Sequence, residues 1–212
     1  MIKAVLWDLD GVLVDSYAMI FRCYEKTLQK FEKKAVLRDH LIKLLGGSGR
    51  DILKMISNAK DEAEFERMFN YFADESAKIS ANIALVDGAG NVLRQLSGKY
   101  LQGIVSSRRR RSLDAILKRN KIDKYFQAVI AYEDVENPKP HPEPILKALE
   151  ILEVESLNAV YIGDMNEDIR AGLDAGVKMI AYRNFYNKHV NFELADHVVE
   201  DLRHIPNIVD KL

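Results

Sequence analysis

The side chains best suited to chemistry follow an apolar stretch near the N-terminus. Asp8 and Asp10 come directly after the apolar residues 4–7. Successive side chains on an extended backbone point to opposite faces, so these two carboxylates project to the same side. Gly11 follows, and glycine allows the close backbone approach that a crowded site needs. Solvated loop aspartates would explain the location but not the pairing, so we expect the two carboxylates to share one site.

A second acidic group follows another apolar stretch, at residues 159–163. Asp164 and Asp168 would meet Asp8 and Asp10 at one sheet edge if the two stretches are neighbouring parallel strands. Two carboxylates 4 Å apart repel by ~4 kcal/mol at an effective dielectric of 20. A hard divalent cation, Mg²⁺ above all, would relieve this repulsion and create a phosphate site. Either later aspartate alone could cap the following helix, but capping does not explain the whole set.

Two further segments carry groups that bind phosphate. Ser106 and Ser107 place hydroxyl and N–H groups at the end of an apolar stretch, before a predicted helix whose N-terminus favours anions. The same serines could serve as the helix cap. Lys139 stands between two prolines, which aim its ammonium group at little entropic cost.

The elements that must position these residues alternate along most of the chain. Apolar stretches and helix-period segments in alternation predict an α/β fold, a Rossmann-like three-layer core with a mostly parallel sheet. Ligands bind such folds beyond the carboxyl ends of the strands. We expect strands at 2–7, 101–106, 127–131, 158–162 and 177–181, and helices at 91–99, 112–120, 142–152 and 167–175.

The segment 16–86 breaks this alternation. It carries helix patterns but no convincing strand, and about seventy strandless residues exceed a normal crossover connection. We therefore predict a small all-helical cap domain over residues 16–86, inserted after the first strand, and a core domain of residues 1–15 and 87–212. The alternative is two ordinary helices packed on a sheet edge.

Composition excludes several classes of protein. The 212 residues include 31 Lys and Arg against 32 Asp and Glu, and a net charge of −1 gives no bulk attraction for nucleic acid or an anionic membrane. No uncharged stretch approaches the ~20 apolar residues of a spanning helix, and the first residues do not resemble a signal peptide. Cys23 is the single cysteine, typical of a reducing compartment. We expect a cytoplasmic monomer or homodimer.

The run from Arg108 to Arg111 departs from this picture. Cations at a helix N-terminus oppose the macrodipole by ~0.3–1 kcal/mol each. We expect the four side chains to be solvated. The alternative is that one guanidinium adds positive potential for an anionic substrate.

The acidic, serine and lysine segments together resemble the haloacid dehalogenase superfamily, in its phosphoglycolate phosphatase and beta-phosphoglucomutase-like branch with a helical cap. The resemblance covers nearly the whole chain, and the order and spacing of the motifs agree. The four motifs correspond to Asp8-Leu9-Asp10-Gly11-Val12, Ser106, Lys139, and Gly163-Asp164 with Asp168.

This resemblance implies catalytic roles for the first two aspartates. Asp8 would attack phosphorus and become an aspartyl phosphate, and Asp10 would protonate the leaving alcohol and then activate water. The second aspartate disfavours the haloacid reaction. We expect a magnesium-dependent phosphatase acting on a small phosphomonoester, phosphoglycolate-like or a sugar phosphate. A phosphomutase of the beta-phosphoglucomutase type stays open, and a non-catalytic phospho-receiver is a more distant alternative.

The resemblance also implies the binding residues. The transferring phosphoryl group would contact Ser106, Ser107 and Lys139. Arg50, which follows the glycine-rich residues 46–49, would contact the non-transferred end of the substrate, although it could equally be an ordinary surface residue at a helix start. The Mg²⁺ ligands would be Asp8, Asp10 through its backbone carbonyl, Asp164, and Asp168 directly or through water.

Overall fold

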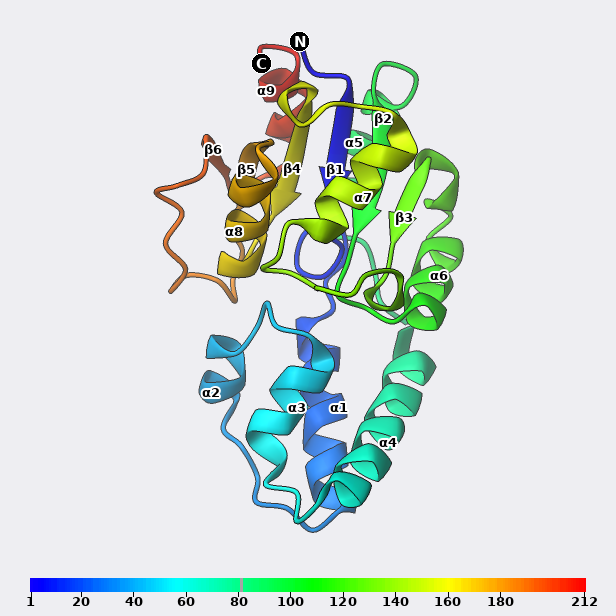
Figure 1. The fold of residues 1–212 in the computed structure, drawn as a ribbon, viewed down its shortest axis with the longest axis vertical. Helices are drawn as coiled ribbons and strands as arrows, with labels where there is room; N and C mark the ends of the chain where they lie inside the picture. Colours follow the sequence, from blue (N-terminus) through cyan, green and yellow to red (C-terminus); the bar gives the residue numbers. More distant parts are fainter. Residues whose placement is uncertain (81) are drawn as a thin grey trace.

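The computed structural model describes residues 1–80 and 82–212, arranged as an α/β lobe and a smaller helical lobe (Figure 1). Residue 81, inside the predicted insert 16–86, lies outside the described residues. Both chain ends lie at the end of the α/β lobe that is remote from the helical lobe (Figure 1).

A six-stranded sheet forms the centre of the α/β lobe, with strand order β3-β2-β1-β4-β5-β6. Every strand pairing among the described residues is parallel. The predicted strands are confirmed to within two residues at each end. The strand β6 was not predicted because it is only three residues long and two of them are exposed. The strands are β1 (Ala4–Trp7), β2 (Leu101–Val105), β3 (Ala128–Ile130), β4 (Ala159–Gly163), β5 (Lys178–Tyr182) and β6 (His197–Val199).

Helices cover both faces of this sheet. Alternate side chains of β1 enter different cores, with Ala4 and Leu6 in one and Val5 and Trp7 in the other. The first core includes side chains of α7 (Glu143–Leu152) and α8 (Asn166–Ala175). The second includes side chains of α5 (Ala89–Leu96), α6 (Arg110–Arg119) and α9 (Ile205–Val209). The predicted three-layer α/β core is therefore confirmed.

The helical lobe is built from four helices that follow β1, and no strand interrupts them among the described residues 17–80. Aromatic side chains hold it together, and Tyr24 stacks on Phe72 with ring centroids 4.6 Å apart. Cys23 is buried in this packing. The four helices are α1 (Tyr17–Lys30), α2 (Arg38–Lys43), α3 (Gly49–Ser57) and α4 (Glu62–Ser80).

The two connections between the lobes run side by side. The backbone N–H of Asp15 donates to the carbonyl of Ala84, and that of Val86 donates to the carbonyl of Leu13. The predicted domain boundaries, 15/16 and 86/87, fall at these paired connections and stay a prediction.

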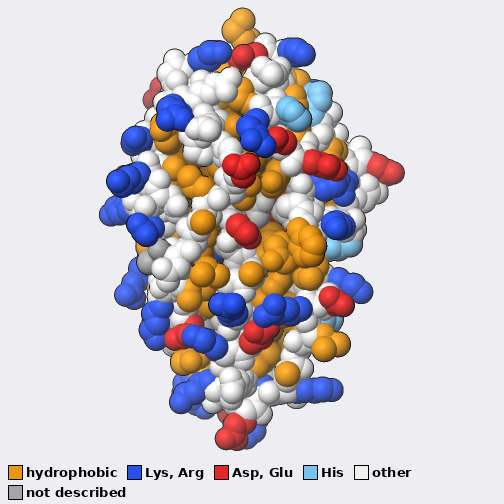
Figure 2. All heavy atoms as spheres, turned by 180° about the vertical axis from the view of Figure 1, so that it is seen from behind, with side chains coloured by type: hydrophobic (Ala, Val, Ile, Leu, Met, Phe, Trp, Pro, Cys, Tyr) orange, Lys and Arg blue, Asp and Glu red, His pale blue; other side chains and the backbone are white. Residues whose placement is uncertain are grey.

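Surface and helix properties of the described residues bear on the predicted partners. No helix in this part of the chain combines the length and apolar character needed to cross a bilayer. Figure 2 shows basic and acidic side chains intermingled over one face, with hydrophobic side chains gathered near the level where the lobes meet.

Candidate active site

The carboxyl ends of the parallel strands point toward the helical lobe (Figure 1), and a cavity of about 130 Å³ lies there. Asp8 follows β1, Ser107 lies beyond β2, and Asp164 follows β4. These strands are adjacent in the sheet, with Trp7 paired to both Ile104 and Ile162, so their ends are level. The predicted residues from distant segments therefore meet around one cavity.

Lys139 is the cation at the centre of this arrangement. Its ammonium nitrogen lies 2.7 Å from Asp8 Oδ1 and 2.6 Å from Asp168 Oδ1, and it also contacts the Tyr161 hydroxyl at 3.0 Å. All four side chains are buried. The two carboxylates raise the pKa of Lys139 against the opposing effect of burial, so the ammonium stays charged.

Three buried carboxylates face this single ammonium. One oxygen from each of Asp8, Asp164 and Asp168 lies within 4.8 Å of the others. Burial raises the pKa of Asp8 to about 7, and Asp168 and Asp10 add repulsion that Lys139 only partly offsets. Burial, together with repulsion from Asp168 and Asp8, raises the pKa of Asp164 well above its ordinary value. An oxygen-only cluster with excess negative charge can hold a hard divalent cation.

Of the three carboxylates, Asp168 accepts the most hydrogen bonds. Its Oδ1 accepts hydrogen bonds from Lys139 and Tyr161, and its Oδ2 accepts from the backbone N–H groups of Asp164 and Met165 at the start of α8. The helix-capping alternative for Asp168 is therefore present in the structure. It coexists with the placement of Asp168 beside Lys139.

Tyr17 is a site residue that sequence reasoning missed. Its hydroxyl lies 3.0 Å from the Asp10 carbonyl oxygen and 2.9 Å from Asp164 Oδ2, among the oxygens predicted to bind metal. Asn184, beyond β5, donates to the same Asp164 oxygen from 2.6 Å. A Cβ at Gly11, where φ is +78°, would come within 2.4 Å of Asp164 Oδ2, so the crowding requires glycine. Tyr17 fits the apolar pattern of α1, which hid its polar role.

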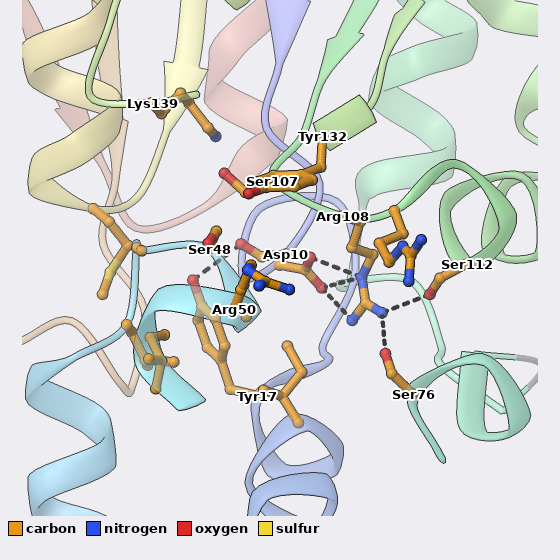
Figure 3. Close-up of a pocket in the computed structure, with 18 of the residues that line it drawn as sticks. Asp10, Tyr17, Ser48, Arg50, Ser76, Ser107, Arg108, Ser112, Tyr132 and Lys139 are labelled. Carbon is orange, nitrogen blue, oxygen red and sulfur yellow. Dashed lines mark hydrogen bonds and ion pairs between the residues drawn. The ribbon is translucent and has the colours of Figure 1, made fainter. Parts of the chain in front are cut away.

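Asp10 lines the cavity but turns its carboxylate away from the Lys139 group. Arg108 forms a bidentate ion pair with this carboxylate, in which Nε lies 2.8 Å from Oδ2 and Nη2 lies 2.7 Å from Oδ1 (Figure 3). Ser16 also donates a short hydrogen bond to Asp10. The remaining guanidinium nitrogen reaches Ser112 of α6 at 2.9 Å and Ser76 of α4 at 3.4 Å, so Arg108 bridges the two lobes.

The expectation that Arg108 to Arg111 are all solvated is wrong for Arg108, which is 7% exposed. The Asp10 carboxylate compensates its charge, and α6 begins only at Arg110, beyond the loop that carries it. Arg109 is exposed, as predicted, and pairs with Glu133, whereas Arg110 is partly buried and pairs with Asp134. Arg111 is exposed, as predicted.

The two predicted serines differ in position. Ser106 is buried, and its hydroxyl accepts a hydrogen bond from the Arg108 backbone N–H rather than capping α6. Ser107 lines the cavity beside Tyr132 (Figure 3).

Arg50 reaches the cavity from the first turn of α3. Its guanidinium carbon lies 4.8 Å from the ring centroid of Phe69, and it forms an ion pair with Glu66. Ser48 caps the helix by accepting from the Asp51 N–H. Arg50 is thus part of the cavity wall rather than a free surface side chain.

Known proteins are similar to this chain in sequence and in fold. A family model described as haloacid dehalogenase-like hydrolase matches residues 5–182. The chain belongs to this hydrolase family. The sequence-based resemblance is confirmed, and family membership makes the chain an enzyme rather than a phospho-receiver.

Individual members of the haloacid dehalogenase-like hydrolases are similar over most of the chain. Pyrophosphatase PpaX of Bacillus cereus strain B4264 is 31% identical over 180 residues, covering 85% of this chain and 82% of that protein. The crystal structure of CbbY from Rhodobacter sphaeroides with phosphate has a TM-score of 0.87 at 20% identity, covering 97% and 96% of the two chains. A predicted phosphoglycolate phosphatase from Haemophilus somnus 129PT has a TM-score of 0.88 at 20% identity, covering 98% and 97%. The two structures share the fold.

Proposed function

We propose that this enzyme is a Mg²⁺-dependent phosphatase that hydrolyses a small phosphomonoester, phosphoglycolate-like or a sugar phosphate. The observation that carries this proposal is the meeting of Asp8, Asp164 and Lys139 at one cavity. The pyrophosphatase relative and the phosphoglycolate phosphatase-like neighbour support phosphoryl chemistry.

The residues present fit a hard divalent cation. The donor set is oxygen only, and three buried carboxylates exceed the one ammonium group beside them. Asp8, Asp164 and the Asp10 carbonyl would hold the ion. Asp168 accepts hydrogen bonds from Lys139, Tyr161 and two backbone N–H groups, so its main role would be to orient Lys139, with the ion reached through water. The bound ion would supply positive charge to the phosphoryl oxygens.

The carboxylates would divide the reaction between them. Lys139 engages Oδ1 of Asp8, and no described residue donates to Oδ2, which leaves that oxygen to attack phosphorus. The bond from phosphorus to the leaving oxygen breaks as an aspartyl phosphate forms, and Asp10 gives its proton to the leaving oxygen. Asp10 then takes a proton from the water that hydrolyses the aspartyl phosphate.

Positive and polar groups beside Asp8 would bind the phosphoryl group. Lys139 lies 2.7 Å from the nucleophilic carboxylate, so its charge is preorganised where negative charge develops. Ser107 lines the same cavity, and Ser106 supports the turn that presents it.

The helical lobe would act as a cap over this chemistry. It contributes Arg50 and aromatic side chains to the cavity, and paired connections join it to the core. We propose that residues 16–86 form the cap domain, that residues 1–15 and 87–212 form the core, and that Arg50 contacts the part of the substrate that is not transferred.

A phosphate-release screen tests the function. The purified protein is incubated with a panel of small phosphomonoesters and with pyrophosphate, with Mg²⁺ or with a chelator. We expect stoichiometric inorganic phosphate from at least one phosphomonoester in Mg²⁺ only. Isomerised sugar phosphate at constant free phosphate would identify a mutase instead, and no turnover of any substrate would refute the proposal.

A further inference from the structure

Apolar side chains form the cavity wall opposite the aspartates. All of them belong to the helical lobe, where Tyr24 and Phe72 present stacked rings with an interplanar angle of 22°. Such a wall favours a group that exposes apolar surface to water when it is free and buries that surface when it binds. Its members are Ile20, Tyr24, Leu45, Ile52, Phe69 and Phe72.

The cations that line the cavity are already paired. Lys139 and Arg108 lie against the catalytic aspartates. Arg109 and Arg50 lie toward the apolar wall, with guanidinium carbons 5.7 Å and 4.8 Å from the ring centroid of Phe69. The carboxylates that pair with these two guanidinium groups are Glu133 at 2.9 Å from Arg109, and Glu66 and Glu62 beside Arg50.

The charge at this end of the cavity disfavours a second anion. Two guanidinium groups face three carboxylates, so an anionic substituent placed there meets excess negative charge. An anion placed beside the apolar wall loses hydration and meets, in the described part of the chain, no unpaired cation that would compensate its charge. By contrast, the Tyr24 hydroxyl has no hydrogen bond to a described residue, which leaves it able to bind one polar atom of an uncharged group.

We propose that the leaving group of the substrate is an uncharged alcohol with a predominantly apolar body, and not a second phosphate or a carboxylate. This inference rests on the proposed phosphatase function and changes its substrate class, because it excludes phosphoglycolate, whose leaving group carries a carboxylate, and disfavours hydroxyl-rich sugar phosphates. It separates this enzyme from one that acts on pyrophosphate, in which the leaving group is itself a phosphate.

A matched pair of substrates tests the proposal. Phenethyl phosphate and its para-carboxylate, 2-(4-carboxyphenyl)ethyl phosphate, share the same primary alkyl leaving oxygen and differ by one charge. We expect kcat/KM at least about tenfold higher for the uncharged substrate, and pyrophosphate to be used less well than either. Equal or better use of the carboxylated substrate would overturn this inference alone. No hydrolysis of any phosphomonoester would overturn the phosphatase function itself.

A charge variant provides a second, independent measurement. Glu66→Gln removes one carboxylate that compensates the charge of Arg50, so Arg50 becomes better able to bind an anion. The preference for the uncharged substrate should therefore fall several-fold. Glu25→Gln is the matched control, because Glu25 pairs with Arg38 on the surface of the helical lobe and does not line the cavity. An unchanged ratio in Glu66→Gln, or an equal change in the control, would contradict the role given to these paired charges.

Discussion

The guanidinium of Arg108 and the carboxylate of Asp10, 98 residues apart in the sequence, form a two-pronged ion pair at the cavity. A planar guanidinium fixes the direction of both carboxylate oxygens. The same side chain contacts Ser76 on α4. The orientation of the proposed acid is therefore linked to the position of the helical lobe.

Replacing Arg108 by lysine should separate charge from orientation. Arg108→Lys keeps the positive charge but cannot bind both Asp10 oxygens with a planar guanidinium. We expect kcat to fall about 10- to 100-fold with little change in KM, because a misplaced acid matters mainly in the transition state. Steady-state kinetics measure this, and Arg111→Lys, at an exposed position, is the control. A wild-type kcat in Arg108→Lys would refute the orienting role.

The proposed nucleophile has a direct test in Asp8→Asn. The amide keeps the shape of the side chain but cannot attack phosphorus, so phosphate release should fall about 10⁴-fold or more. The melting temperature should stay the same or rise, because burial already raises the pKa of Asp8 to about 7 and a neutral amide removes that desolvation cost. Asp15→Asn, at an exposed neighbouring aspartate, should retain activity. Residual turnover near wild type in Asp8→Asn would assign the nucleophile elsewhere.

The Tyr17 hydroxyl competes for the oxygens proposed to hold the metal. Tyr17→Phe removes a donor to buried Asp164, so the metal-free protein should lose about 1–3 kcal/mol of unfolding free energy. The affinity for Mg²⁺, measured by titration calorimetry, should rise, because no hydroxyl has to be displaced. Tyr186→Phe is the control, since that ring packs edge-on against Tyr17 and its hydroxyl bonds to no described residue. Weaker Mg²⁺ binding in Tyr17→Phe would instead make the hydroxyl a partner of the ion.

The raised pKa of Asp8 predicts how metal and pH act together. Between pH 3.8, the ordinary pKa of an aspartate, and about pH 7, the raised pKa of Asp8, the metal-free folded state binds more protons at Asp8 than the unfolded chain does. The contribution of Asp8 to the unfolding free energy therefore decreases as pH rises through this window. A divalent cation binds the deprotonated carboxylate, so the increase in melting temperature on adding Mg²⁺ should grow from about pH 5 to about pH 8.

Thermal melts with Mg²⁺ or chelator at constant ionic strength measure this dependence. In Asp8→Asn the growth with pH should be smaller, because the titrating group is gone. A Mg²⁺ effect of equal size at every pH would contradict the assignment of Asp8 as a ligand.

Much of the candidate site could be predicted from local patterns in the sequence. Asp8 and Asp164 stand at strand ends, and Lys139 stands between prolines, so local patterns and the parallel-sheet rule were enough to bring them together. The predicted helices agreed with the structure to within three residues at each end, because apolar spacing reflects which face of each helix is buried. The error at Arg108 arose because a basic run looks the same whether or not a distant carboxylate neutralises one member.

The sequence by itself determined which strands end in acidic, hydroxyl and cationic groups, because alternation and strand polarity are local properties. Only the tertiary structure decided which partner each group takes. Arg108 binds Asp10, which is 98 residues away in the sequence, and Tyr17 donates a hydrogen bond to Asp164, which is 147 residues away. The physical reason is that a hydrogen bond depends on separations of a few ångströms between side chains, and these separations are set by how the helical lobe packs against the sheet edge.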